Sequence, residues 1–143
     1  MQETYRSPWM TEDLDMLRTT ARRFFEEEVA PKAAKFRAQH HIDRDVWEKA
    51  GELGLLCMSI PEEYGGMGAS FAHEVVVMEE QARICDTTFG FIPGGVNGPA
   101  FFHGTASPEQ LKRWMPGIAA GKQMLCVCIT EPDAGTDVKA MRT

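Results

Sequence analysis

The sequence predicts a mainly α-helical protein that ends at a single β-strand. Apolar residues recur at helical spacing through most of residues 12–121, and four segments start at a residue that favours a helix N-terminus. The spacing changes in residues 124–130, because "MLCVCIT" is a continuous apolar run typical of a buried strand. A lone strand leaves its backbone groups unpaired. We therefore expect strands of another chain, or further sequence of a longer protein, to complete the sheet.

The first helix is predicted to begin after Thr11, whose side chain can cap it. Two acidic residues in its first turn, Glu12 and Asp13, lie at the positive end of the helix dipole. Pro31 interrupts this helix, and residues 32–40 resume it after a kink. Apolar residues recur on one face of the first segment, at Leu14, Leu17, Ala21, Phe24 and Phe25.

Two further helices are predicted on either side of a long loop, residues 55–70, in which Pro61 and three glycines prevent regular structure. Asp43 can cap the helix before the loop, and Gly54 suits its C-terminal stop. Ser70 can cap the helix after the loop. The apolar stripe of the earlier helix is Val46, Trp47, Ala50 and Leu53, and the expected core residues of the later one are Val75, Met78 and Ala82.

Two further helical segments are predicted between residue 87 and Gly121. Residues 87–105 are apolar and rich in glycine, which is consistent with a helix of small residues that a neighbour or a ligand can approach closely. Ser107 at the N-cap, Pro108 at the first position and Gln110 at the third predict a capping box. Gly121 lies where this last helix should end.

Composition excludes several classes of protein. The chain has 143 residues, which is enough for one domain with a core, and its net charge of −6 argues against nucleic acid as a partner. We find no apolar run long enough to span a membrane and no signal or transit pattern at the start, so we expect a cytoplasmic protein. The four cysteines lack the paired spacing of a zinc site, and we interpret them as small buried thiols rather than metal ligands.

A polar loop, "ITEPDAGTD" at residues 129–137, follows the predicted strand. Thr130 offers a hydroxyl, and Gly135 has no Cβ, so a bulky group can approach the main chain there. The amides of residues 135–137 could open a short helical turn and bind phosphate, with the acidic side chains turned away or accepting main-chain hydrogen bonds. The residues alone leave open an ordinary turn, because P-D-A-G is also good turn sequence.

The segment "CITEPDAGTD" resembles the signature [VIL]-T-E-P-x-A-G-S-D of the flavin-dependent acyl-CoA dehydrogenase family. Three segments upstream resemble the family in the same order and spacing: "RRFFEEEVAP", "IPEEYGG" and "ASPEQLKRWMPGIAAGK". The likeness covers nearly the whole chain. Thr136 departs from the commonest Ser of the signature but retains the hydroxyl.

The resemblance implies an N-terminal helical domain at residues 1–122 and the truncated start of a middle β-domain at residues 123–143. It implies an FAD cofactor and an acyl-CoA substrate, with Thr136 also touching the substrate and Phe91 to Gly95 bordering the acyl chain. The residues that would contact the cofactor are Val127, Ile129, Thr130, Gly135 and Thr136.

The reaction implied is α,β-dehydrogenation of the acyl-CoA, in which a Glu removes the α-proton and the β-hydride passes to the flavin. In the family this Glu belongs to a later helical domain, so we assign no catalytic residue and no metal ligand within this chain, and we expect the chain alone to be inactive. The implied partners are electron-transfer flavoprotein as electron acceptor and copies of the protein itself, in a homotetramer or homodimer.

Two alternatives stay open. The first is an acyl-CoA oxidase or another flavoenzyme of the same fold, which differs in how the reduced flavin meets oxygen. The second is a non-catalytic helical oligomerisation module, in which the strand at residues 124–130 pairs with a copy of itself.

Overall fold

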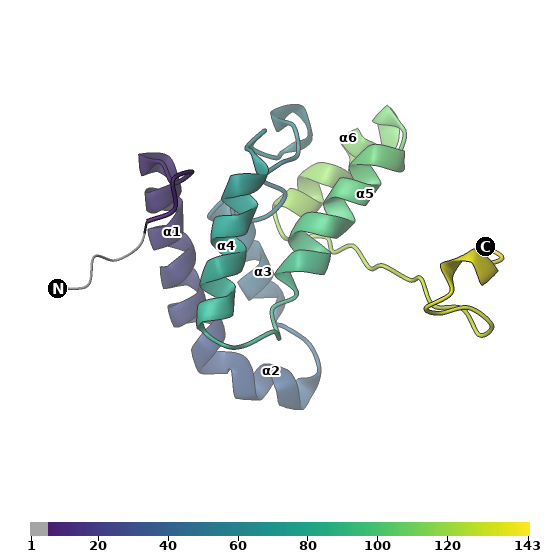
Figure 1. Ribbon diagram of the computed structural model, residues 1–143, viewed down its shortest axis with the longest axis horizontal. Helices are drawn as coiled ribbons and strands as arrows, with labels where there is room; N and C mark the ends of the chain where they lie inside the picture. Colours follow the sequence, from purple (N-terminus) through teal and green to yellow (C-terminus); the bar gives the residue numbers. More distant parts are fainter. Residues whose placement is uncertain (1–5) are drawn as a thin grey trace.

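The computed structural model describes residues 6–143 and confirms a mainly α-helical chain (Figure 1). Its α-helices are α1 (Glu12–Phe24), α2 (Ala33–Gln39), α3 (Arg44–Glu52), α4 (Phe71–Arg83), α5 (Gly98–Thr105) and α6 (Pro108–Ala119). Shorter helical turns are Phe25–Val29, Ala30–Lys32, Glu62–Tyr64, Ile92–Asn97 and Val138–Ala140.

The predicted interruption of the first helix at Pro31 is confirmed. After α1 the backbone widens into a π-helical turn at Phe25–Val29 and then tightens into a 3-10 turn at Ala30–Lys32 before α2 begins. Proline has no N–H to donate to the carbonyl four residues earlier, so the regular ladder cannot continue through it. This bend turns α2 across the lower end of α1 and α4 (Figure 1).

An aromatic cluster forms the centre of the core. The Phe89 ring stacks on Trp47 of α3, with centroids 4.3 Å apart, and meets Phe24 and Phe25 edge to face at 5.5 and 5.9 Å. All four side chains are at most 4% exposed. Three segments that are distant in sequence therefore meet at Phe89.

Helices α1 and α4 pack side by side and share a buried ion cluster. Glu80 of α4 is 2% exposed, and its carboxylate accepts two hydrogen bonds from Arg22 of α1, at 2.9 and 3.0 Å. The Nε atoms of Arg83 and Arg18 lie 3.2 and 3.5 Å from the same carboxylate. The hydrogen bonds and negative charge of Glu80 raise the pKa of Arg22.

The buried face of α4 differs from the expected one. Met78 is half-buried and packs against the core, but Val75 is only half-buried and Ala82 is exposed, so the prediction is wrong for the last two. The residues that α4 buries are Glu74, Val76, Val77, Glu80 and Gln81. The apolar pattern gave the wrong face because two of the buried residues are acids, and one of them, Glu80, is paired with Arg18 and Arg22 of α1 and with Arg83 of α4.

The predicted N-cap positions are correct, but only one makes the predicted bonds. Ser107 accepts a hydrogen bond from the Gln110 amide at 3.3 Å, and the Gln110 side chain accepts one from the Ser107 amide at 2.8 Å. Thr11, Asp43 and Ser70 precede α1, α3 and α4 without a side-chain bond to the helix backbone. Asp43, for example, accepts from Lys35 and Gln39 instead.

The end of α6 is fixed to α3 by a close contact at Gly121. Its backbone has φ of +69°, and a Cβ added there would lie 2.0 Å from the carbonyl oxygen of Trp47. Arg44 donates a hydrogen bond to the next carbonyl, that of Lys122, at 2.8 Å. Only glycine satisfies both the left-handed backbone and the missing space.

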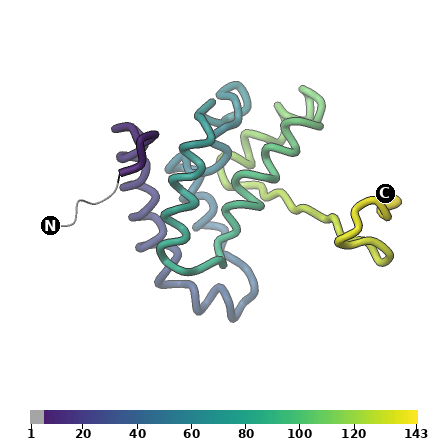
Figure 2. The backbone as a smooth tube through the Cα atoms, in the orientation of Figure 1, coloured from purple at the N-terminus to yellow at the C-terminus, as the bar shows by residue number. Residues whose placement is uncertain are grey.

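Beyond Gly121 the chain leaves the helices (Figure 2). Residues 124–130 form no strand ladder with any other described residue, so the expected strand is not formed here. An extended segment becomes a strand only when a second strand accepts and donates its hydrogen bonds, and the described chain supplies none. The sole bridge in residues 6–143 is between Glu131 and Ala134.

Candidate functional site

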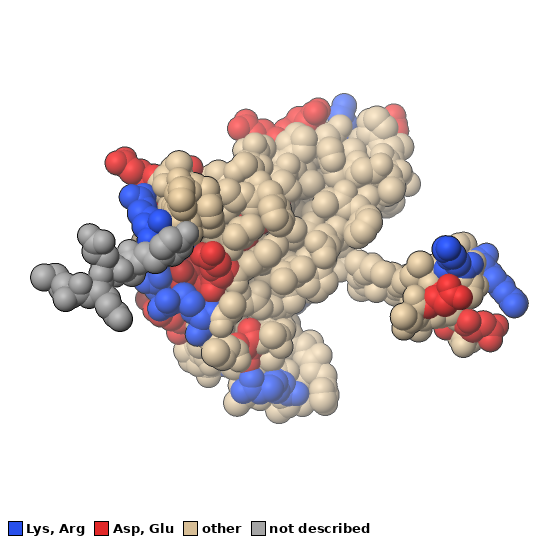
Figure 3. Space-filling model, in the orientation of Figure 1, with Lys and Arg blue, Asp and Glu red and all other residues tan. Residues whose placement is uncertain are grey.

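An apolar cavity of about 490 Å³ opens between the C-terminal half of α4 and the start of the next helical segment. In Figure 3 the surface over α5 carries almost no charged side chains. The cavity is lined by Met78, Gln81, Ala82, Cys85, Asp86, Thr87, Phe89, Gly90, Phe91, Ile92 and Pro93.

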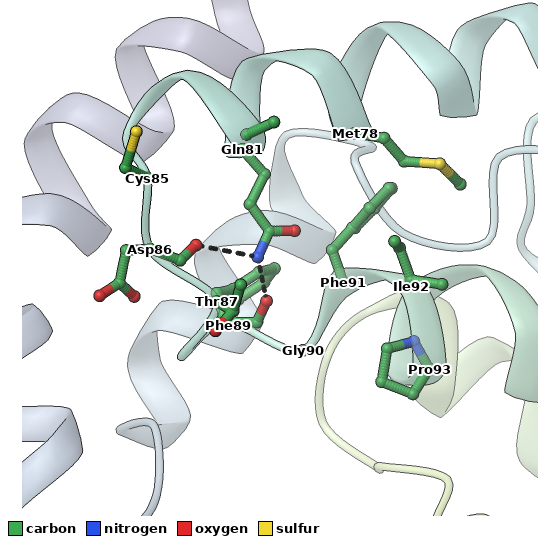
Figure 4. Close-up of a pocket in the computed structure, with 11 residues that line it drawn as sticks. Met78, Gln81, Cys85, Asp86, Thr87, Phe89, Gly90, Phe91, Ile92 and Pro93 are labelled. Carbon is green, nitrogen blue, oxygen red and sulfur yellow. Dashed lines mark hydrogen bonds between the residues drawn. The ribbon is translucent and has the colours of Figure 1, made fainter.

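Gln81 holds the loop that forms the floor of this cavity (Figure 4). Its Nε2 atom donates to the carbonyl oxygen of Phe89 and makes a longer contact, 3.5 Å, with the carbonyl oxygen of Asp86. The Asp86 carboxylate accepts from the Thr88 amide at 2.9 Å and from Arg37 of α2. These bonds shape a loop that has no regular secondary structure between α4 and the next helical segment.

The segment Phe91 to Gly95, expected to border an acyl chain, is divided between the cavity and the core. Phe91, Ile92 and Pro93 line the cavity. Gly94 faces the Trp47 ring, which would lie 3.0 Å from an added Cβ, and the Gly95 carbonyl accepts a hydrogen bond from the Cys57 amide. The glycines therefore serve close packing of this segment against the core.

The C-terminal loop is a tight turn closed by backbone bonds. The amide of Glu131 donates to the carbonyl of Ala134 at 2.8 Å, and the reverse bond is 3.3 Å. The Glu131 carboxylate accepts from the amides of Arg142 and Thr143 at 2.9 and 3.0 Å. Hydrogen bonds from Thr143, and then that from the Arg142 amide, lower the pKa of Glu131. The expectation that acidic side chains of this loop accept main-chain bonds is confirmed for Glu131 and for Asp137, whose carboxylate accepts from the Lys139 amide.

The residues assigned to the cofactor are all exposed, two of them in the extended segment before the turn and three at the turn itself. Thr130 and Gly135 come together, because a Cβ added to Gly135 would lie 3.8 Å from Cγ2 of Thr130. Val127 and Ile129 are 49% and 50% exposed, and Thr136 is exposed as well. Within residues 6–143 neither threonine hydroxyl makes a hydrogen bond to another side chain or to the backbone.

The predicted helical turn after the loop is present at Val138–Ala140. Its N-terminus is already occupied, since the Asp137 carboxylate accepts from the Lys139 amide at 3.1 Å. A carboxylate at this position repels a phosphate. The turn itself therefore gives no support to phosphate binding at residues 135–137.

Val127 also lines a second groove of about 290 Å³ between α5 and the departing chain. Phe101 of α5 is 69% exposed beside it, and Leu125 packs against Gly98, where an added Cβ would be 3.3 Å from the Leu125 Cβ. The groove is open and its walls are apolar.

The cysteines do not behave as one group. Cys57 is buried as expected, and burial, with a smaller contribution from Glu74, raises the pKa of its thiol to about 12. Cys85, Cys126 and Cys128 are exposed, so the expectation of buried thiols is wrong for them. No group of three or more potential metal ligands occurs in the described part of the chain.

None of the helices in residues 6–143 combines the length and apolar character needed to cross a bilayer.

Comparison with known proteins shows the family of this chain. The family described as "Acyl-CoA dehydrogenase, N-terminal domain" matches residues 11–122. The chain belongs to the acyl-CoA dehydrogenase family. The mitochondrial long-chain specific acyl-CoA dehydrogenase of Sus scrofa is 37% identical over 129 residues, which are 90% of this chain and 30% of that relative.

Solved structures confirm the helical fold. An acyl-CoA dehydrogenase from Geobacillus kaustophilus matches with a TM-score of 0.83 at 29% identity, covering 95% of this chain and 36% of its own. An acyl-CoA dehydrogenase from Bacillus anthracis, solved in complex with FAD, matches with a TM-score of 0.74 at 27% identity, covering 96% and 24%. The chain spans about a third of the length of the curated relatives it matches.

Sequence reasoning missed Gln81 and Glu80. A partial signal for Glu80 was present, since Arg18 and Arg22 are four residues apart on one face of the first helix, where both guanidinium groups can pair with one acid of a neighbouring helix. Nothing in the sequence identified Gln81, because its role depends on a loop whose path no local pattern predicts.

Proposed function

We propose that this chain is the helical part of an FAD-dependent acyl-CoA dehydrogenase. The observation that carries the proposal is the loop at residues 129–137, which combines the family signature with a face of uncommitted groups. We propose residues 1–122 as the helical domain and residues 123–143 as the beginning of a β-domain, a boundary that agrees with the end of the family match at residue 122.

The loop residues fit a bound flavin. Gly135 does not have a positive φ, and an added Cβ would meet only Cγ2 of Thr130, at an ordinary contact distance of 3.8 Å. Nothing within the described chain therefore requires glycine at this position, which supports a requirement imposed by a ligand. The hydroxyls of Thr130 and Thr136 can hydrogen-bond to a flavin, and Val127 and Ile129 can cover its apolar surface.

The acyl group would occupy the cavity beside α4. Its walls at Phe91, Ile92 and Pro93 are apolar, as an alkyl chain requires. Thr136 would approach the thioester side of the substrate. These residues bind and orient the acyl group and exclude water from it.

FAD, when bound, supplies the hydride acceptor. The Glu that removes the α-proton belongs to the part of the family fold beyond this chain, so this chain contributes binding and positioning rather than proton transfer. We propose electron-transfer flavoprotein as the electron acceptor and a homo-oligomeric assembly, a homotetramer or a homodimer. Cytoplasmic localisation stays a prediction.

One experiment tests this proposal. The complete protein that contains this chain is loaded with FAD and mixed with saturated acyl-CoAs of increasing length in the absence of oxygen. We expect at least one acyl-CoA to bleach the flavin absorbance and to yield the 2-enoyl product. Absence of bleaching with every acyl-CoA tested would reject the proposal.

The same preparation separates the alternatives. Rapid hydrogen peroxide formation in air, without an added acceptor, identifies an oxidase. For this chain on its own, a stable dimer with no flavin absorbance favours the oligomerisation module, whose apolar segment at residues 124–130 pairs between copies.

A further inference from the structure

Gln81 places a polar atom on the wall of an otherwise mainly apolar cavity. The side chain is 9% exposed, and its Nε2 atom faces two carbonyl oxygens, those of Phe89 and Asp86. Only the NH₂ group of an amide can donate to carbonyl oxygens, so the contacts fix which way the amide is turned. Its Oε1 atom consequently points away from the loop and toward Phe91 (Figure 4).

This oxygen has no donor among the residues that the structure describes, 6–143. Other polar groups around the cavity differ from it. The Asp86 carboxylate is turned away from Phe91 and accepts from Thr88 and Arg37, whereas Thr87 is exposed at the cavity mouth. Oε1 of Gln81 is therefore an acceptor without a protein donor, on a residue that is 9% exposed, and it is held in place by its own amide nitrogen.

A plain alkyl chain leaves Oε1 of Gln81 without a hydrogen bond, whereas an acyl chain that carries a donor supplies one. An alkyl chain that reaches Gln81 removes water from Oε1 and offers no hydrogen bond in return. A hydroxyl at the same depth replaces the lost water with a direct bond. The difference between an unsatisfied and a satisfied buried acceptor corresponds to about tenfold in affinity, or more.

We infer that Gln81 determines the acyl specificity of this cavity by accepting a hydrogen bond from a donor, such as a hydroxyl, carried on the distal part of the acyl group. The inference rests on the proposed function, because it requires the acyl group to enter the cavity. Gln81 then has two roles. Its Nε2 atom holds the floor of the cavity through the Phe89 carbonyl, and its Oε1 atom distinguishes donor-bearing from plain acyl groups.

The test compares matched acyl-CoAs on the complete FAD-loaded protein. Each pair has the same number of chain atoms, and one member ends in a hydroxyl where the other ends in a methyl group. We expect the ratio of kcat/KM, hydroxyl over methyl, to rise to about ten at the length that reaches Gln81, mainly through KM. Shorter pairs give a ratio near one. A wild-type ratio at or below one at every length overturns the inference without any variant.

Two variants locate the effect. Gln81→Met keeps a side chain of similar length but has no strong acceptor, so the ratio falls to about one. Thr87→Val removes a hydroxyl from the mouth of the same cavity and leaves the ratio as in the wild type. A Gln81→Met protein that keeps the preference assigns it to another group and rejects the inference.

Failure of the proposed function gives a different result. In that case neither member of any pair bleaches the flavin, whereas failure of this inference leaves both members oxidised at equal kcat/KM. Circular dichroism of Gln81→Met shows whether the loop change has altered the fold, and the wild-type ratio decides the question if it has.

Discussion

Replacing Glu80 by Gln tests whether the buried ion cluster holds α1 against α4. Glu80 is 2% exposed and accepts from Arg22, while Arg83 and Arg18 lie within 3.5 Å. Gln has the same shape, but its NH₂ group would face guanidinium donors, and the arginines would lose their shared counter-charge. Removing one partner of a buried pair costs about 3–5 kcal/mol. The three arginines are 27–57% exposed and can regain water, so we expect a lower value, about 2–3 kcal/mol.

The assay is urea unfolding followed by far-UV circular dichroism at pH 7. With a slope of about 1.5–2 kcal/mol per molar urea, the midpoint of Glu80→Gln falls by about 1–2 M. Glu79→Gln is the matched control, because Glu79 is the preceding residue of α4, is also paired with Arg18, and is 47% exposed. Its cost should stay below about 1 kcal/mol. Equal midpoints for the two variants would refute the importance of burial.

Three further predictions concern single positions. In the complete protein, Thr130→Ala should weaken FAD binding or slow flavin reduction; if neither dissociation constant nor reduction rate changes, Thr130 is not in the site. Ser107→Ala should cost about 1 kcal/mol in urea unfolding, because it removes a capping bond, whereas Thr11→Ala, which removes none, should cost clearly less; similar costs would contradict the capping assignment. Burial by itself raises the pKa of Asp86, but hydrogen bonds from Thr88 and the charge of Arg37 outweigh it, so the folded pKa is lowered. The contribution of Asp86 is therefore complete above its unfolded pKa of about 3.9 and is lost as the pH falls through the folded value. Asp86→Asn should then reduce stability at pH 7 more than at pH 3, and an equal loss at both would exclude this linkage.

Local sequence rules predicted most of the helical frame. Pro31, Ser107 and Gly121 each act through their own backbone chemistry, so their effects can be inferred without knowing any distant contact. The family signature at residues 129–137 was recognisable for the same reason, since the residues that define it are adjacent in the chain.

Features that depend on distant partners could not be predicted. The buried face of α4 contains Glu80 instead of Ala82, because Glu80 is paired with arginines about sixty residues earlier in the chain. The strand at residues 124–130 has the right composition, yet strand formation requires a partner that the described chain does not contain. The role of Gln81 could not be predicted because it depends on a hydrogen bond to the Phe89 carbonyl, whose position is set by stacking of Phe89 on Trp47.

The close contact at Gly121 fixes the point at which the C-terminal segment leaves the helices. Seven residues, 122–128, lie between Gly121 and the loop at residues 129–137, and a fully extended chain of that length reaches about 23 Å. A change of about 10° in the direction of the chain at Gly121 would move the start of this loop by about 4 Å. This is several times the misplacement that disrupts positioning of reacting groups. The tight fit of Gly121 against the Trp47 carbonyl therefore acts as an angular constraint. Gly121, which is not among the residues proposed to contact the flavin, thus helps to orient the loop that is.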